Sequence, residues 1–308
     1  MDVTPAEVAA LLARHHRPLV GGAVAALGEG DFCHAFVVDD AWVVRVAKHA
    51  EAAEALRREA CLLPSLAAAL PLSIPRPVHT FAGAGGDPAF TVHAMLPGPA
   101  LTRERWEELA PARRDASARQ VGDFLATLHG LAIAPARACG VPALDVEHRR
   151  ATLAAEARLT LLPRVDLAAR QLVHTVLRAD PRTADAPRPA PVILHGDLSP
   201  DHVLCDAATG TVTGIIDFGD LAIGDPAWDL VFVYEDYGLD FLGALLPAYP
   251  TADLAGLLAR MQRFLELDAV AWCVRCAGED DGAALDEALA YLGALRARSD
   301  APPWRALL

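Results

Sequence analysis

The segment from Pro191 to Leu230 constrains this chain most, because it combines short apolar runs with a dense set of carboxylates. It contains no lysine or arginine. Its seven acidic side chains are Asp197, Asp201, Asp206, Asp217, Asp220, Asp225 and Asp229. A solvated surface usually mixes both signs of charge, and carboxylates crowded in this way repel one another. The segment therefore needs a positive partner, which a divalent metal ion, a cationic substrate or both would supply.

The apolar runs of the same segment predict β-strands. Residues 192–194 and 203–205 are two short runs, and a β-branched run over 211–216 follows a turn at 206–210. The last two runs form a hairpin, and pairing across it places Asp217 opposite about residue 200. We therefore expect Asp217 to lie beside the loop that carries Asp197 and His202. Three groups able to bind metal or transfer protons then converge on one point.

Two motifs flank this hairpin, namely His195-Gly196-Asp197 and Ile216-Asp217-Phe218-Gly219-Asp220. They resemble the catalytic loop and the metal-binding motif of the aminoglycoside phosphotransferase family, a branch of the protein-kinase-like fold. Within that family the chain looks most similar to the aminoglycoside 2″-phosphotransferases. The resemblance implies that Asp197 accepts the proton of the substrate hydroxyl.

The same resemblance implies a metal site for Mg²⁺ at the end of the hairpin. Asp217 would bind the metal ion that bridges the nucleotide phosphates. His202 stands where the family usually has an asparagine ligand. Imidazole can bind a divalent ion, although magnesium prefers oxygen ligands. We interpret His202 as a second metal ligand that marks a subfamily.

The resemblance further implies an α+β fold of two lobes. A small, β-rich N-terminal lobe over residues 1–96 would bind the nucleotide. A larger, mainly helical lobe over 97–308 would carry catalysis and acceptor binding. Residues 90–96 would form the last strand before the hinge, where the backbone of Ala94 and Leu96 reads the purine. In the second lobe we expect an amphipathic helix over 117–131 with a packing histidine at His129, an exposed connector over 179–191, and helices over 238–298.

The N-terminal part supplies what a kinase-like fold needs around a nucleotide. Gly28 and Gly30 lie in a turn between two predicted strands, where glycine lets backbone amides approach phosphates. A basic residue of the next strand, 42–48, would pair with the phosphates, and Glu59 on the following helix would be its partner. Arg45 and Lys48 both qualify, but alternation along a strand puts them on opposite faces. We favour Arg45.

The negative charge is concentrated in the C-terminal part. Residues 1–189 hold 21 acidic and 21 basic side chains, whereas residues 190–308 hold 19 and 6 and account for the net charge of −13. Metal binding needs only two or three of these acids, and the surplus suits a polycationic acceptor. The candidate acceptor-binding residues are Asp220, Glu235, Asp236, Glu266 and Asp268. For any one of them a solvated acidic face is the alternative, and the same field excludes nucleic acid as a partner.

The remaining composition predicts a monomer in the cytoplasm without membrane contact. No apolar run is long enough to span a bilayer, and the N-terminus is acidic where a signal peptide would be basic. The six cysteines are then expected to be reduced. Cys273 and Cys276 have the spacing of a redox or zinc pair, but no second pair completes a zinc site, so we expect them to pack in the core.

Three functions remain after these arguments. The first is transfer of the γ-phosphoryl of GTP or ATP to an aminoglycoside hydroxyl, with GTP used at least as well as ATP by subfamily resemblance. The second is the same chemistry on a macrolide or another small molecule, for which a single amine would need fewer carboxylates. The third is a kinase-like binding module without catalysis, which the presence of both Asp197 and Asp217 disfavours.

Overall fold

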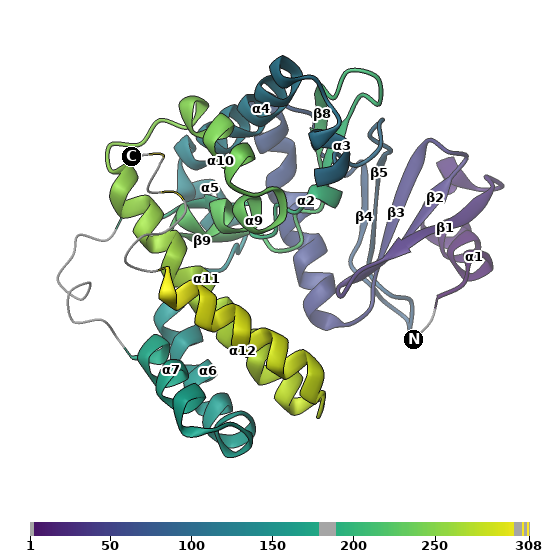
Figure 1. Ribbon diagram of the computed structural model, residues 1–308. Helices are drawn as coiled ribbons and strands as arrows, with labels where there is room; N and C mark the ends of the chain where they lie inside the picture. Colours follow the sequence, from purple (N-terminus) through teal and green to yellow (C-terminus); the bar gives the residue numbers. More distant parts are fainter. Residues whose placement is uncertain (1–2, 179–188, 299–303, 305–306, 308) are drawn as a thin grey trace.

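The protein consists of a sheet-centred N-terminal part and a larger helical part, as the computed structural model in Figure 1 shows. The structure describes residues 3–178, 189–298, 304 and 307. Within these residues the expected α+β kinase-like arrangement is confirmed. The connector expected over 179–191 lies outside the described residues except for its last three positions. The division into lobes at residue 96 stays a prediction.

The N-terminal sheet has five antiparallel strands in the order β1-β2-β3-β5-β4. Its strands are β1 (Val24–Glu29), β2 (Cys33–Val38), β3 (Trp42–Ala47), β4 (His79–Phe81) and β5 (Phe90–Ala94). One face of the sheet packs on α1 (Pro5–His15), because Val8, Leu11 and Leu12 of the helix are buried with apolar side chains of β2, β3 and β5. The helix begins at a capping box in which Thr4 and Glu7 bond each other's backbone amide.

Helix α2 (Ala50–Ala69) runs from the sheet into the helical part (Figure 1). In its first half, Ala52 and Leu56 pack with residues of β2 and β3. In its second half, Leu62, Leu63 and Leu66 belong to the large core of the C-terminal part. The helix therefore joins two hydrophobic cores, and a movement of one core relative to the other must move α2.

The C-terminal part is helical around one large core. Its helices are α3 (Arg103–Glu107), α4 (Pro111–Gly130), α5 (Ile133–Ala138), α6 (Val146–Thr160), α7 (Leu167–Leu177), α9 (Ala227–Tyr237), α10 (Leu239–Leu245), α11 (Leu254–Gly278) and α12 (Gly282–Ala297). Short 3₁₀ turns occupy Arg17–Leu19, Leu162–Arg164, Pro200–His202 and Leu246–Ala248. The expected amphipathic helix lies within α4, and the helices expected after residue 238 are α10, α11 and α12.

Two small antiparallel pairs carry the motif-bearing segment. Strand β6 (Val192–Leu194) pairs with β9 (Ala222–Gly224), and β7 (Val203–Cys205) pairs with β8 (Val212–Ile215). The hairpin β7–β8 is the predicted one. Its second strand, β8, is one residue shorter at each end than the expected run over 211–216. The chain leaving β5 lies beside it, because the amide of Leu101 donates to the carbonyl of Val203 at 2.7 Å.

The cysteines contradict one expectation. Cys61 and Cys139 form a disulfide, so these two are oxidised where reduced thiols were predicted. The fold brings their Cα atoms to 5.6 Å, a separation suited to a disulfide, although the two residues lie 78 positions apart in the sequence. Cys273 and Cys276 are buried free thiols, as expected. In the described part of the chain, no helix is long and apolar enough to cross a membrane.

Candidate active site

The hairpin β7–β8 places its two motifs side by side. The amide of Ile216 donates to the carbonyl of His202 at 2.9 Å, so the residue after β8 lies against the end of the loop that carries Asp197 and His202. Asp217 then turns through a left-handed conformation with φ 59°, which aims its side chain back toward the loop. Gly196 has φ 93°, and a Cβ there would collide with the backbone carbonyl of Asp220. Only glycine fits at that contact.

His202 lies between the two carboxylates, as the sequence predicted. Its Nδ1 is 2.7 Å from the carbonyl oxygen of Asp197 and its Nε2 is 3.7 Å from Asp217 Oδ2. A carbonyl only accepts hydrogen bonds, so Nδ1 carries a proton, and in the neutral ring Nε2 is the nitrogen with a free lone pair. The carboxylate of Asp197 is 39% exposed and remains accessible to a substrate.

The loop that carries Asp197 is held by Asp229, which is fully buried at the start of α9. Its two carboxylate oxygens each accept one backbone amide at 2.9 Å, from His195 and Gly196. The Nε2 of His129 donates to the same carboxylate at 3.0 Å, and the His129 Nδ1 lies 2.7 Å from the Tyr249 hydroxyl. Burial opposes the ionisation of Asp229, but these hydrogen bonds and the nearby His129 lower its pKa. Asp229 therefore remains charged and holds the loop. His129 is buried, as expected, and is also part of this network.

Arg45 joins the sheet to the hairpin. Its guanidinium contacts Glu59 Oε2 at 2.5 Å and Asp217 Oδ1 at 2.9 Å. Burial opposes the charge on Arg45, but the carboxylates of Glu59 and Asp217 outweigh it and raise the Arg45 pKa. Burial likewise opposes the charge on Asp217, but the charge of Arg45, and that of His202 when its ring is protonated, lower the Asp217 pKa. The pair Arg45–Glu59 thus forms as the sequence predicted, directly beside Asp217.

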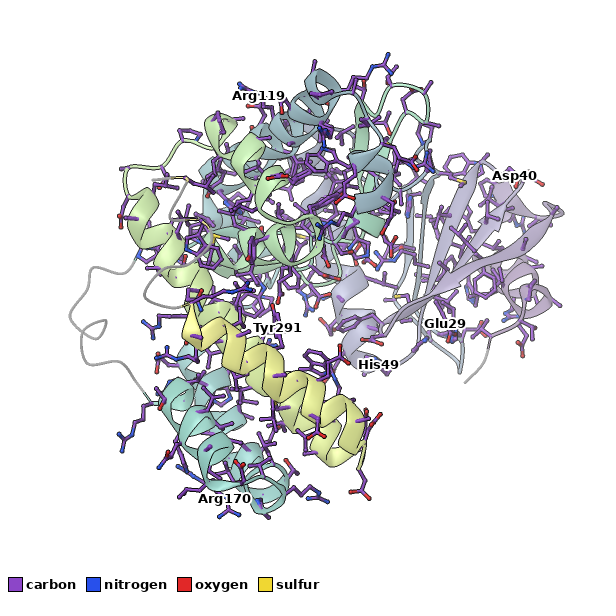
Figure 2. The ribbon with its side chains drawn as sticks, viewed as in Figure 1. Glu29, Asp40, His49, Arg119, Arg170 and Tyr291 are labelled. Carbon is purple, nitrogen blue, oxygen red and sulfur yellow. A yellow bond between two sulfur atoms is a disulfide. The ribbon has the colours of Figure 1, made fainter. Side chains whose placement is uncertain are left out.

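Lys48 lies elsewhere. Its ammonium is 3.7 Å from Glu29 at the end of β1, which Figure 2 labels at the edge of the sheet. The nearby Gly28 and Gly30 are exposed, and a Cβ added at either would meet no atom within 4 Å. This loop therefore has open space around its backbone.

The backbone after β5 is only partly hydrogen-bonded within the described residues. The carbonyl of Ala94 accepts from His93 Nδ1 at 2.9 Å, whereas the backbone of Leu96 makes no hydrogen bond to another described residue.

The donor set fits a magnesium ion that is held mainly by phosphate. Among the described residues, no three histidine, cysteine or acidic side chains converge closely enough to hold a metal by themselves. Magnesium usually takes one or two carboxylates and completes its octahedron with water and substrate phosphates. Asp217 Oδ2, with the lone pair of His202 beside it, is such a partial site.

Comparison with known proteins agrees with this geometry. The sequence profile of the phosphotransferase enzyme family called APH matches residues 31–264. The chain belongs to this family. It is therefore a phosphotransferase with a kinase-like fold.

Three known proteins similar to this APH-family protein are informative. Viomycin phosphotransferase of Streptomyces vinaceus is 31% identical over 250 residues, covering 76% of this chain and 80% of that protein. The GDP and kanamycin complex of an APH(2″) enzyme superimposes with a TM-score of 0.83 at 28% identity, covering 94% of this chain and 98% of that one. A macrolide 2′-phosphotransferase from Brachybacterium faecium, at 21% identity and a TM-score of 0.66, shares the fold.

The candidate acceptor residues other than Glu266 in this APH-family protein divide into two groups. Asp220 and Asp236 lie close enough to Asp197 to feel its charge. Burial raises the pKa of both, and the charge of Asp197 raises it further. Glu235 and Asp268 form the second group. Partial desolvation, with the charge of Asp268, raises the Glu235 pKa to about 7. The hydroxyl of Tyr291, which Figure 2 labels on α12, donates to Glu235 at 3.2 Å.

Glu266 is a correction to the predicted acceptor set. It is 4% exposed, and both of its oxygens pair with the guanidinium of Arg296 at 3.0 and 3.1 Å. Gln262 donates to it as well, at 2.8 Å. Glu266 is therefore paired within the protein, where it joins α11 to α12, and it is not available to bind an acceptor.

The sequence reasoning missed two residues that shape the site. Trp228 donates its indole N–H to the carbonyl of Gly196 at 3.1 Å, next to the catalytic loop. Tyr291 reaches Glu235 from a helix 56 residues further along the chain. The only available signal for Trp228 was its place beside Asp229. No sequence signal pointed to Tyr291.

Proposed function

We propose that this protein transfers the γ-phosphoryl group of GTP or ATP to a hydroxyl of a polycationic aminoglycoside. The supporting observation is the joint position of Asp197, His202 and Asp217, together with acidic side chains that form no ion pair with a basic residue in the described part of the chain. The relatives named for viomycin and aminoglycoside phosphotransfer act on antibiotics, which agrees with this acceptor class.

Asp197 is the proposed proton acceptor. Its carboxylate is partly exposed, and its backbone is held by His202 and by the neighbouring Asp229 contacts. As the acceptor hydroxyl oxygen bonds to the γ-phosphorus, the bond from phosphorus to the bridging oxygen breaks and the nucleoside diphosphate leaves. The hydroxyl proton passes to Asp197. Positioning and electrostatics supply most of the catalysis in such a transfer.

Arg45, Asp217 and His202 form the proposed phosphate side of the site. When bound, magnesium would neutralise the phosphate charge, with Asp217 and His202 as its protein ligands. Arg45 is held by Glu59 in an orientation that directs positive charge at this position. We therefore expect Arg45→Met to raise the nucleotide KM more than Lys48→Met, because the Lys48 ammonium pairs with Glu29 and with no other carboxylate of the described residues.

The proposed nucleotide cleft lies between residues 1–96 and 97–308. Gly28 and Gly30 would cover the phosphates, since the space beside them is open. The backbone of Ala94 and Leu96 would meet the purine edge, since Leu96 has no hydrogen bond to another described residue. Competition between GTP and ATP in one assay tests the expectation that GTP is used at least as well. We propose that the enzyme acts as a monomer in the cytoplasm, where these nucleotides are available.

The proposed acceptor face consists of Asp220, Glu235, Asp236 and Asp268. These carboxylates lie on the loop after β8 and on α9 and α11, and Asp220 and Asp236 couple electrostatically to Asp197. Several ammonium groups would be needed to neutralise them. A macrolide carries a single basic amine, so this face favours the aminoglycoside over the macrolide alternative.

A panel assay tests the proposal. Purified protein is incubated with magnesium, GTP or ATP, and kanamycin, viomycin or a macrolide, and phosphorylated product is measured by mass spectrometry. We expect kanamycin-type acceptors to be phosphorylated, with an acceptor KM that rises with salt as the contacts are screened over a Debye length of about 8 Å. Turnover of the macrolide alone, without salt dependence, would replace this proposal by the macrolide alternative.

A further inference from the structure

The disulfide between Cys61 and Cys139 connects the catalytic machinery to a distant part of the fold. Cys61 lies on α2, two residues after Glu59, and Cys139 follows α5. Two residues on a helix are about 200° apart, so Glu59 and Cys61 project from nearly opposite sides of α2. On one side Glu59 meets Arg45, and on the other side Cys61 is bonded to the C-terminal part.

The rest of α2 shows why such a cross-link matters. Leu56 packs with the sheet, whereas Leu62 and Leu66 pack in the large C-terminal core. The disulfide lies between these two groups of contacts. It therefore restrains α2, the helix that joins the two cores. The restraint acts two residues from Glu59, whose contact with Arg45 orients Arg45 toward Asp217.

The bond is also chemically accessible. Cys61 is exposed and Cys139 is buried. Arg57 lies one turn before Cys61, and its Nε pairs with Glu54 at 2.8 Å. Its Nη2 extends to the chain after Cys139, where it would lie 3.0 Å from a Cβ added at Gly140. A cation beside a cysteine stabilises its thiolate, which makes it a better leaving group. The four free cysteines, by contrast, are all buried.

We propose that Cys61–Cys139 is a thiol–disulfide exchange site through which small thiols control the position of α2, and with it nucleotide binding. A thiolate attacks the exposed sulfur of Cys61, forms a mixed disulfide and releases Cys139 as a thiolate that takes up a proton. A second thiol then resolves the mixed disulfide, so that Cys61 becomes a thiol and the two small thiols leave as their disulfide. The protein gains two electrons and two protons, which the thiols supply. The cytoplasm, which supplies nucleoside triphosphates, also contains small thiols in abundance.

The experiment first measures the chemistry. Native protein is treated with dithiothreitol, alkylated without denaturant and digested for mass spectrometry. We expect alkylation at Cys61 and Cys139 only after reduction. Arg57→Gln should slow the reduction about twofold or more. Arg119→Gln, which removes an exposed charge on α4 (Figure 2), should leave the rate unchanged. Resistance of the bond to dithiothreitol in the folded protein, or equal rates for both variants, would overturn the exchange site.

The second measurement is nucleotide affinity, determined by direct titration without acceptor. We expect reduction to raise the nucleotide Kd at least about threefold and re-oxidation to restore it. The double variant Cys61→Ser/Cys139→Ala should have the nucleotide Kd of the reduced protein, and dithiothreitol should not change it. Equal affinities for oxidised and reduced protein, with both thiols alkylated, would overturn the control of α2. The link to turnover rests on the proposed function, but this titration does not. A redox effect on affinity in a protein that phosphorylates no acceptor would refute only the proposed function.

Discussion

Removing the disulfide should lower the thermal stability by an amount that its position in the chain determines. The bond joins residues 78 positions apart. In the chain-entropy treatment, closing such a loop stabilises the folded state by about 4.5 kcal/mol at 25 °C, because the unfolded chain loses conformations. For a chain of 308 residues, the unfolding entropy is about 0.65 kcal/mol/K near 60 °C. Dividing the first by the second gives a Tm decrease of about 7 °C.

The measurement is differential scanning calorimetry on oxidised protein, on protein kept in dithiothreitol, and on Cys61→Ser/Cys139→Ala. We expect the reduced protein and the double variant to melt at the same lower temperature, and the double variant to melt alike with and without dithiothreitol. A decrease below about 2 °C in both would refute the reasoning, since it would mean that the bond restrains little of the unfolded chain.

Three further predictions concern the proposed site. Asp197→Asn should lower kcat by about 10²–10⁴ while the nucleotide Kd stays nearly unchanged, because the proton acceptor acts on the acceptor hydroxyl; comparable kcat in the variant would contradict its role. Asp217→Ala should abolish magnesium-dependent nucleotide binding, whereas His202→Asn should keep substantial activity because an amide oxygen also binds magnesium. If titration found the two variants equally unable to bind nucleotide, His202 would have another role. The Glu235 pKa of about 7 means that this residue gains negative charge as pH rises through 7. The acceptor KM should therefore fall more steeply between pH 6 and 8 for the wild type than for Glu235→Gln, and parallel profiles would exclude Glu235 from the acceptor face.

The convergence of the two motifs was predictable because it follows from strand register. The hairpin pairs Val203 with Ile215, so the two motifs at its ends meet once the turn is located. For Arg45 and Lys48, alternation along the predicted strand 42–48 indicated only that the two side chains project from opposite faces. The family resemblance favoured Arg45, and the structure pairs Arg45 with Glu59 and Lys48 with Glu29.

The disulfide could not be predicted in this way. Cys61 lies on α2 and Cys139 follows α5, and no local pattern relates the two positions. The expectation of reduced thiols came from an argument about compartment, which applies to cysteines in general. Their pairing depends on how α2 and α5 approach each other in the tertiary structure.

The acceptor face shows why net charge predicts the sign of a partner but not the residues that bind it. Glu266 and Asp268 are two positions apart on α11, and the sequence treats them alike. A helix turns about 200° over two residues, so one of them faces Arg296 in the interior while the other faces solvent. Pairing with Arg296 removes one negative charge from the face without changing the sequence count that suggested it. The helix–helix contact between α11 and α12 therefore decides which carboxylates remain for a cation, and that contact is set by packing rather than by any motif in the chain.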